Sequence, residues 1–161
     1  MKKILFISFL MLFAPMVSAN SISSKAILGE WICTTFISLD EYSLLETYHI
    51  NLKKNSSADQ KGTIHFTDAK EDALVTYESS SNWSLKGNIL SFKNLKAHKY
   101  SVDNENFQKK YQILNIFADS HYNDIDDYEI QKLTEKELIF HSKSDQFDWL
   151  SLIVTCFREK S

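Results

Sequence analysis

The sequence predicts a mainly β protein, an antiparallel β-barrel of about eight or nine strands with one helix. Short runs of alternating polar and apolar residues recur along the chain, and polar turns separate most of them. Of the 161 residues, 24% are charged and 43% apolar, with two cysteines, three glycines and one proline. This composition excludes collagen-like, Pro/Gly-rich disordered, cysteine-dense and strongly basic nucleic-acid-binding chains.

The first segment, Met1 to Ala19, has the pattern of a cleaved export signal. Lys2 and Lys3 precede an apolar run, and Val17-Ser18-Ala19 offers small residues to a signal peptidase. The alternative is a retained membrane anchor, but the apolar run is shorter than the roughly 20 residues that span a bilayer. We therefore expect one domain over residues 20–161, periplasmic or secreted, with no stable membrane anchor after cleavage.

Cys33 and Cys156 lie near the two ends of that domain. An exported protein with two cysteines most simply pairs them, whereas buried free thiols would be the default in the cytosol. The sequence therefore predicts a disulfide that brings the two ends of the domain together.

The first half of the domain reads as a series of strands. The predicted strands are Glu30–Ile37, a run in which Leu44, Tyr48, Ile50 and Leu52 alternate, Thr63–Thr67, Ala73–Glu78, a run with Trp83 and Leu85, and Ile89–Lys93. Polar residues predict turns at Asn55–Gly62 and at Asp68–Asp72. Lys86-Gly87-Asn88 predicts a tight hairpin, because glycine and asparagine tolerate positive φ.

The segment from Asp103 to Asp119 changes period. Phe107, Tyr111, Leu114 and Phe117 recur at helical spacing, which predicts a helix that Asp103 or Asn104 caps. A strand is the alternative, because some of the same apolar residues also alternate with polar ones.

Three further strands are expected after this segment: Tyr128–Leu133, Leu138–Ser142 and Asp148–Arg158. The polar stretch Thr134–Glu137 predicts the turn between the first two.

Several of these residues together resemble the small exported lipocalin-like proteins of bacteria. They are Gly29-Glu30-Trp31, Trp83 before the Lys-Gly-Asn hairpin, the strand Tyr128–Leu133 with its following turn, and the terminal Thr155-Cys156-Phe157-Arg158. The resemblance implies a calycin-type barrel in which the tryptophan plugs one end and an arginine near the end of the chain packs across it. Trp31 and Arg158 would fill these two roles.

A register argument supports the same closure. Antiparallel partners share one sum of residue numbers, and the pairs Cys33–Cys156 and Trp31–Arg158 have the same sum. One register therefore places the two sulfurs opposite each other and Arg158 over Trp31 as a cation-π partner. It also predicts an outer apolar surface, with Ile32 opposite Phe157 and Phe36 opposite Ile153, which we expect the helix after Asp103 to cover.

Catalytic motifs are absent from the sequence. It contains no Gly-x-Ser-x-Gly, no phosphate-binding glycine loop and no dinucleotide fingerprint, and its histidines lack the spacing of a helical metal site. We expect a protein that is not an enzyme and needs no cofactor or metal.

One polar segment, from Asp119 to Asp127, concentrates charge. The candidate partner-binding residues in it are Asp119, His121, Tyr122, Asp124, Asp126 and Asp127. Such a segment could dock a basic envelope protein, bind calcium or be a solvated loop, although the glycine and final glutamate of an EF-hand loop are missing.

The expected function is therefore binding. The barrel either holds a small apolar ligand, as the resemblance implies, or is filled by its own side chains and binds a protein through its surface. Aromatic residues make up 13% of the chain, enough to fill a small barrel. In the second case the protein would be a periplasmic immunity or inhibitor protein that blocks a toxin or a cell-wall hydrolase through surface loops.

Overall fold

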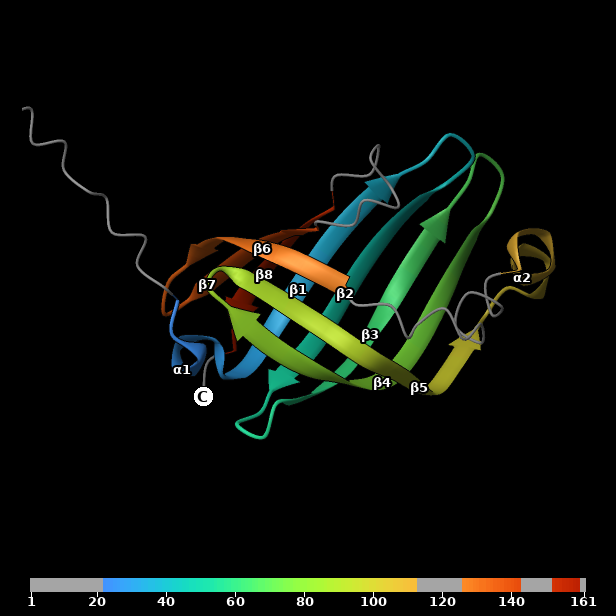
Figure 1. Ribbon diagram of the computed structural model, residues 1–161. Coiled ribbons are helices and arrows are strands. Elements are labelled where there is room, and N and C mark those ends of the chain that lie inside the picture. The colour runs from blue at the N-terminus through green and yellow to red at the C-terminus, as the bar shows by residue number, and fades with distance from the viewer. Residues whose placement is uncertain (1–21, 113–125, 143–151, 160–161) are drawn as a thin grey trace, which may run out of the picture.

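A computed structural model of the chain describes residues 22–112, 126–142 and 152–159, and in these ranges it forms a barrel of eight strands (Figure 1). The strands are β1 (Gly29–Ser38), β2 (Ser43–Leu52), β3 (Ser57–Thr67), β4 (Asp72–Lys86), β5 (Ile89–Val102), β6 (Asp126–Leu133), β7 (Glu137–Ser142) and β8 (Ile153–Arg158). Each strand pairs antiparallel with the next, and β8 pairs with β1 to close the ring. The predicted fold class, a mainly antiparallel β-barrel, is confirmed.

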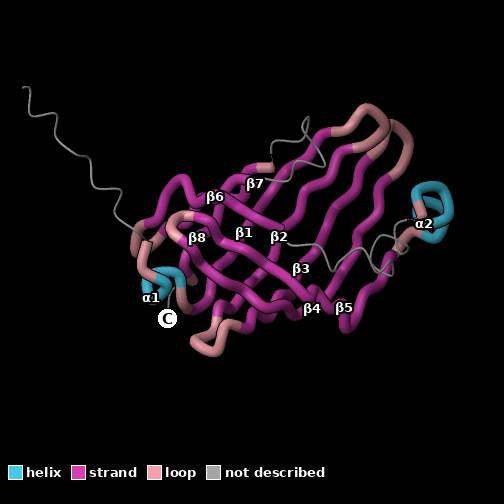
Figure 2. The backbone as a smooth tube through the Cα atoms, in the orientation of Figure 1, coloured by secondary structure: helices cyan, strands magenta, loops and turns pink. Residues whose placement is uncertain are grey.

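Two short helices lie at opposite ends of the barrel (Figure 2). α1 (Ser24–Ile27), which the sequence pattern does not predict, begins at the N-cap Ser23 and precedes β1. α2 (Glu105–Tyr111) follows β5, and the side chain of Asn104 caps it by accepting from the backbone N–H of Phe107. The predicted cap and start are therefore correct, whereas the part of the predicted helix after residue 112 lies outside the described residues. We call the two ends of the barrel the α1 end and the α2 end.

The predicted turn at Asn55–Gly62 is wrong. β3 already begins at Ser57, and only the residues before it turn, where Lys53 N–H donates to the Ser57 carbonyl at 2.9 Å. Polar residues fit this strand because Asp59 and Lys61 point outward into solvent. The predicted strands at Ala73–Glu78 and around Trp83 are likewise parts of one long strand, β4.

The closure between β1 and β8 has the register that the sequence predicts. Trp31 pairs with Arg158, Ile32 with Phe157 and Cys33 with Cys156. The two cysteines form the predicted disulfide, with their Cα atoms 4.0 Å apart. The start and end of the domain are therefore joined covalently as well as by strand pairing.

The barrel is less continuous between β5 and β6. Among the described residues, β6 pairs only with Ile89–Phe92 of β5, so residues 93–102 of β5 border no strand on that side. This part of β5 is the wall of the barrel toward the α2 end.

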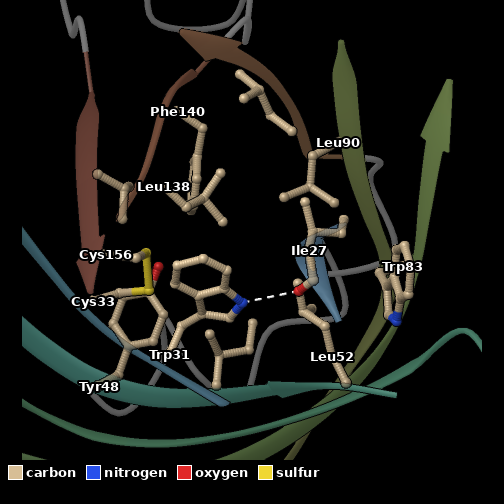
Figure 3. Close-up of a cluster of buried hydrophobic side chains, with 14 of the residues drawn as sticks. Ile27, Trp31, Cys33, Tyr48, Leu52, Trp83, Leu90, Leu138, Phe140 and Cys156 are labelled. Carbon is tan, nitrogen blue, oxygen red and sulfur yellow. Dashed lines mark hydrogen bonds between the residues drawn. A yellow bond between two sulfur atoms is a disulfide. The ribbon is translucent and has the colours of Figure 1, made fainter. Parts of the chain in front are cut away.

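The main core fills the α1 end (Figure 3). It consists of inward-facing side chains from all eight strands together with Ile27 of α1. The fully buried members include Ile27, Trp31, Cys33, Leu52, Leu90, Leu138 and Cys156. Close packing at this end leaves its inward-facing side chains little accessible surface.

A second, smaller core lies at the α2 end. Phe107 of α2 is fully buried against the inward-facing side chains of Phe66, Ala73 and Val75. The expectation that this helix covers the outer apolar surface is therefore wrong, because its apolar face closes over the barrel interior instead. Residues on the outside stay exposed: Phe36 by 63%, Ile153 by 56%, Phe157 by 55% and Leu45 by 43%. We call these four residues the outer apolar patch.

Candidate functional site

The predicted partner-binding segment can be placed only in part. Asp119, His121, Tyr122 and Asp124 lie outside the described residues, whereas Asp126 and Asp127 begin β6. Asp127 pairs with Ser91, and its Oδ1 is buried without a hydrogen-bond partner. Within the described ranges, no group of three His, Cys, Asp or Glu residues could hold a metal ion.

Arg158 and Trp31 organise the α1 end. The guanidinium carbon lies 4.1 Å from the centroid of the Trp31 ring, within cation-π range. Its nitrogens donate to the carbonyls of Leu28 at 2.7 Å, Ala26 at 2.8 Å and Glu135 at 2.8 Å. One side chain thus connects α1, the start of β1, the β6–β7 turn and β8, and this end of the barrel is closed.

The backbone at position 29 requires glycine, which accounts for the first residue of Gly29-Glu30-Trp31. Its φ of 106° is one that side-chain-bearing residues rarely adopt, and a Cβ there would lie 3.1 Å from Nη1 of Arg158. Below the guanidinium, the indole N–H of Trp31 donates to the Ile27 carbonyl at 2.8 Å, as Figure 3 shows. The motif therefore forms part of the closed end of the barrel.

The interior changes character toward the α2 end. There the inward-facing side chains of Glu46, Gln60 and Ile64 are only part-buried, and Tyr100 is 41% exposed. Water therefore reaches side chains that point into the barrel in this half. Apolar neighbours on the same face, among them Leu44 and Val102, are also only part-buried.

A chain of hydrogen bonds crosses this half of the interior. Gln60 Nε2 donates to the Tyr77 hydroxyl at 2.7 Å, and that hydroxyl donates to Oε1 of Glu46. The cross-strand pairs Glu46–Ile64 and Gly62–Tyr77 place these groups on neighbouring strands of one wall. They form a polar cluster, Glu46–Tyr77–Gln60, in a mainly apolar interior.

The surroundings disfavour charge on these groups. Burial raises the pKa of Glu46, and the hydrogen bond from Tyr77 opposes that rise. Burial, together with the nearby Glu46 carboxyl, also raises the pKa of Tyr77 and of Tyr48, so both phenols stay protonated at neutral pH. Tyr77 is therefore a fixed donor to Glu46.

Gly62 lets the strands around this cluster approach closely. A Cβ at Gly62 would lie 2.5 Å from the Tyr48 Cβ and 2.6 Å from the Thr47 carbonyl oxygen. In the cross-strand row Tyr48–Gly62–Tyr77, no side chain separates the two tyrosines. Any other residue would push β2 and β3 apart at the level of the cluster.

α2 is attached to the β3–β4 turn beside this interior. The buried carboxylate of Asp68 accepts from the backbone N–H of Lys70 at 2.7 Å, from Lys110 Nζ and from the Tyr111 hydroxyl at 2.8 Å. These hydrogen bonds lower the pKa of Asp68, the bond from Lys110 most of all. Because Lys110 and Tyr111 belong to α2, the Asp68 carboxylate holds the helix against the barrel.

A shallow groove of about 880 Å³ lies on the outer face of β2–β5. Most of its lining is outward-facing hydroxyls and charged groups, and Tyr77 and Tyr100 also border it. Two pairs in the lining satisfy each other: Lys99 pairs with Glu78 at 3.2 Å, and the hydroxyls of Thr76 and Ser101 lie 2.7 Å apart. A groove with these pairings is typical of a solvated sheet face, and we place the candidate site in the interior.

Comparison with known protein families gives no matching family model, and comparison with curated proteins gives no match. The candidate site therefore rests on geometry. Sequence reasoning missed it, although a signal is present: Leu44, Tyr48, Ile50 and Leu52 form one apolar stripe, and Glu46 occupies the remaining position of that stripe. A carboxylate inside an inward-facing stripe predicts a buried polar site.

Proposed function

We propose that the protein is a non-enzymatic binding protein that holds one small, mainly apolar molecule in the α2 half of its barrel. The observation that carries this proposal is the part-buried Glu46 carboxyl, which points into the barrel interior between the main core and the smaller core around Phe107, where neighbouring inward-facing side chains are also only part-buried. Ligand sites in proteins are mostly apolar and contain a few polar groups that orient the ligand. An eight-stranded barrel can hold one such molecule where its own side chains do not fill it.

The closed end supports the same proposal. One sealed end and one end open to ligand entry fit a barrel that binds a ligand inside. Trp31, Arg158 and α1 seal the first, while α2 and residues 93–102 of β5, which pair with no described strand on one side, border the second. This arrangement also supports the resemblance to exported lipocalin-like proteins, and we include that relationship in the proposal.

An exported location belongs to the proposal as well. The Cys33–Cys156 disulfide is typical of proteins in oxidising compartments. In the part of the chain that the structure describes, neither helix has the length and apolar character needed to cross a membrane. N-terminal sequencing of the protein purified from its natural host tests export: a mature chain that begins at Asn20 supports it, and one that keeps Met1–Ala19 contradicts it.

Occupation of the interior is tested with an apolar fluorescent probe that is displaced by lipid extracts. Ile64 faces inward beside Glu46, and Thr63 faces the outer groove on the same strand. We expect Ile64→Trp to fill the interior and abolish the probe signal, while Thr63→Trp preserves it. Equal signals from the two variants would place the probe elsewhere and contradict the proposal.

The outer apolar patch favours a second candidate function, docking of a protein in the manner of an inhibitor or immunity protein. Four large apolar side chains on β8, β1 and β2 face outward with no described element over them. Affinity capture from cell-envelope extracts with the wild type and with a Phe36→Ser, Phe157→Ser variant tests this candidate. Loss of a specific target in the variant alone supports docking, and identical captured proteins contradict it.

A further inference from the structure

The polar cluster in the barrel has a fixed direction. Gln60 donates to Tyr77 and Tyr77 donates to Glu46, so the chain of hydrogen bonds ends on a group that, when ionised, only accepts. No described residue bonds to Oε2 of Glu46. While Glu46 is ionised, a ligand that meets this oxygen must therefore bring a hydrogen-bond donor.

The charges around Glu46 also favour a ligand that brings a hydrogen-bond donor. The inward-facing residues that flank Glu46 across the strands are Thr35 and Ile64, and the next ones along its own strand are Leu44 and Tyr48. None of these side chains is a cation, and the phenols of Tyr48 and Tyr77 are neutral. Within the described interior, the Glu46 carboxylate has no positive partner. A ligand carboxylate would be repelled by it and would find only neutral donors such as the Tyr48 phenol.

We propose that the barrel selects small amphiphiles whose polar end is a hydrogen-bond donor, a primary ammonium above all, and discriminates against fatty-acid carboxylates. This inference rests on the proposed ligand-binding function and adds the chemical class of the ligand. The ammonium would donate to Oε2 of Glu46 while its alkyl chain lies among the apolar side chains of the interior, such as Leu44 and Val102. Charge-assisted hydrogen bonds of this type are among the strongest in proteins.

Three ligands with the same alkyl chain test the inference: octylamine, octanol and octanoate, each used below its aggregation concentration to displace the apolar probe at pH 7. The wild type should bind octylamine at least about 10-fold more tightly than octanoate, as expected for one charge-assisted hydrogen bond, with octanol between them. Equal affinities for octylamine and octanoate would overturn the inference and leave the proposed function standing. Failure of all three to displace the probe would instead contradict the proposed function.

A matched pair of variants locates the preference. Glu46→Gln keeps the shape of the side chain and removes its charge. The affinity for octylamine should therefore fall to within a few-fold of the affinity for octanol, while octanol still binds. Glu78→Gln makes the same change on the outer face of β4 and should keep the wild-type preference. Retention of the amine preference by Glu46→Gln would overturn the inference. Persistent octanol binding shows that the variant has folded.

Discussion

The guanidinium of Arg158 lies over the indole of Trp31 while three of its nitrogens donate to carbonyls of Ala26, Leu28 and Glu135. This relationship joins residues that are far apart in the chain, and it depends on the planar fork of arginine as well as on its charge. The seal at the α1 end therefore has a specific chemical requirement.

Arg158→Lys should lower the free energy of unfolding by about 1–3 kcal/mol, because lysine keeps the charge but reaches fewer of the three carbonyls. Urea denaturation measures the change. The neighbouring Glu159→Gln is the matched control, since the exposed Glu159 carboxylate pairs with the exposed His49 at 3.4 Å and its loss should change stability by less than about 0.5 kcal/mol. If both variants show the same small change, Arg158 does not stabilise the seal.

Reduction of the Cys33–Cys156 disulfide should destabilise the barrel by about 4–5 kcal/mol in the chain-entropy description, because the bond closes a loop between residues 123 positions apart. Thermal unfolding with and without reductant measures this effect. A Cys33→Ala, Cys156→Ala variant should unfold at one lower temperature under both conditions. A melting temperature of the wild type that does not respond to complete reduction would contradict the prediction.

Glu46→Gln should change how stability depends on pH. Burial raises the pKa of Glu46 above its ordinary value of 4.5, so the folded wild type binds more protons than the unfolded chain in the interval between the two pKa values. Its stability must then fall as pH rises through this interval. The glutamine variant does not titrate there, so its stability relative to the wild type should increase with pH, as urea denaturation across the acid-to-neutral range would measure.

Tyr77→Phe provides the complementary variant. It removes the hydrogen bond that favours the Glu46 carboxylate, so the pKa of Glu46 should rise further and the decline in stability should extend to higher pH. Parallel pH profiles for the wild type and both variants would show that Glu46 does not titrate in a buried site.

Gly62→Ala should destabilise the barrel by about 2–4 kcal/mol, because the new methyl group would overlap the Tyr48 Cβ and the Thr47 carbonyl and force β2 and β3 apart. Gly87→Ala is the control: its φ is 66°, and a Cβ there meets nothing within 4 Å. Only the backbone strain of about 1–2 kcal/mol then applies. Equal stability of the two alanine variants would contradict the predicted steric overlap at Gly62.

The closure of the barrel could be predicted from sequence because it depends only on residue positions. A single antiparallel register satisfies both Cys33–Cys156 and Trp31–Arg158, and no knowledge of side-chain packing is needed to find it. α1 could not be found in this way, since four residues are too few to show a helical period.

Two of the wrong or missed predictions, the turn at Asn55–Gly62 and the position of Glu46, have the same physical origin. In a barrel, polar residues occur inside strands as well as in turns, so Asp59 and Lys61 in β3 have the same composition as a loop. The same ambiguity concealed Glu46, whose position in an apolar stripe becomes informative only when the stripe is known to face inward. The sequence pattern could also not predict which surface α2 covers, because an apolar helix face fits the barrel interior and its outside equally well.

The most direct test of the central claim is a proton–nitrogen NMR spectrum of the labelled protein during titration with octylamine. The side-chain amide of Gln60 faces the interior next to Tyr77, whereas that of Asn82 is exposed on the outer face of β4. If a ligand occupies the barrel at Glu46, the Gln60 amide signals should shift to saturation while those of Asn82 stay in place. Saturating shifts confined to Asn82 and other outward-facing residues, or no shifts at all, would contradict the claim.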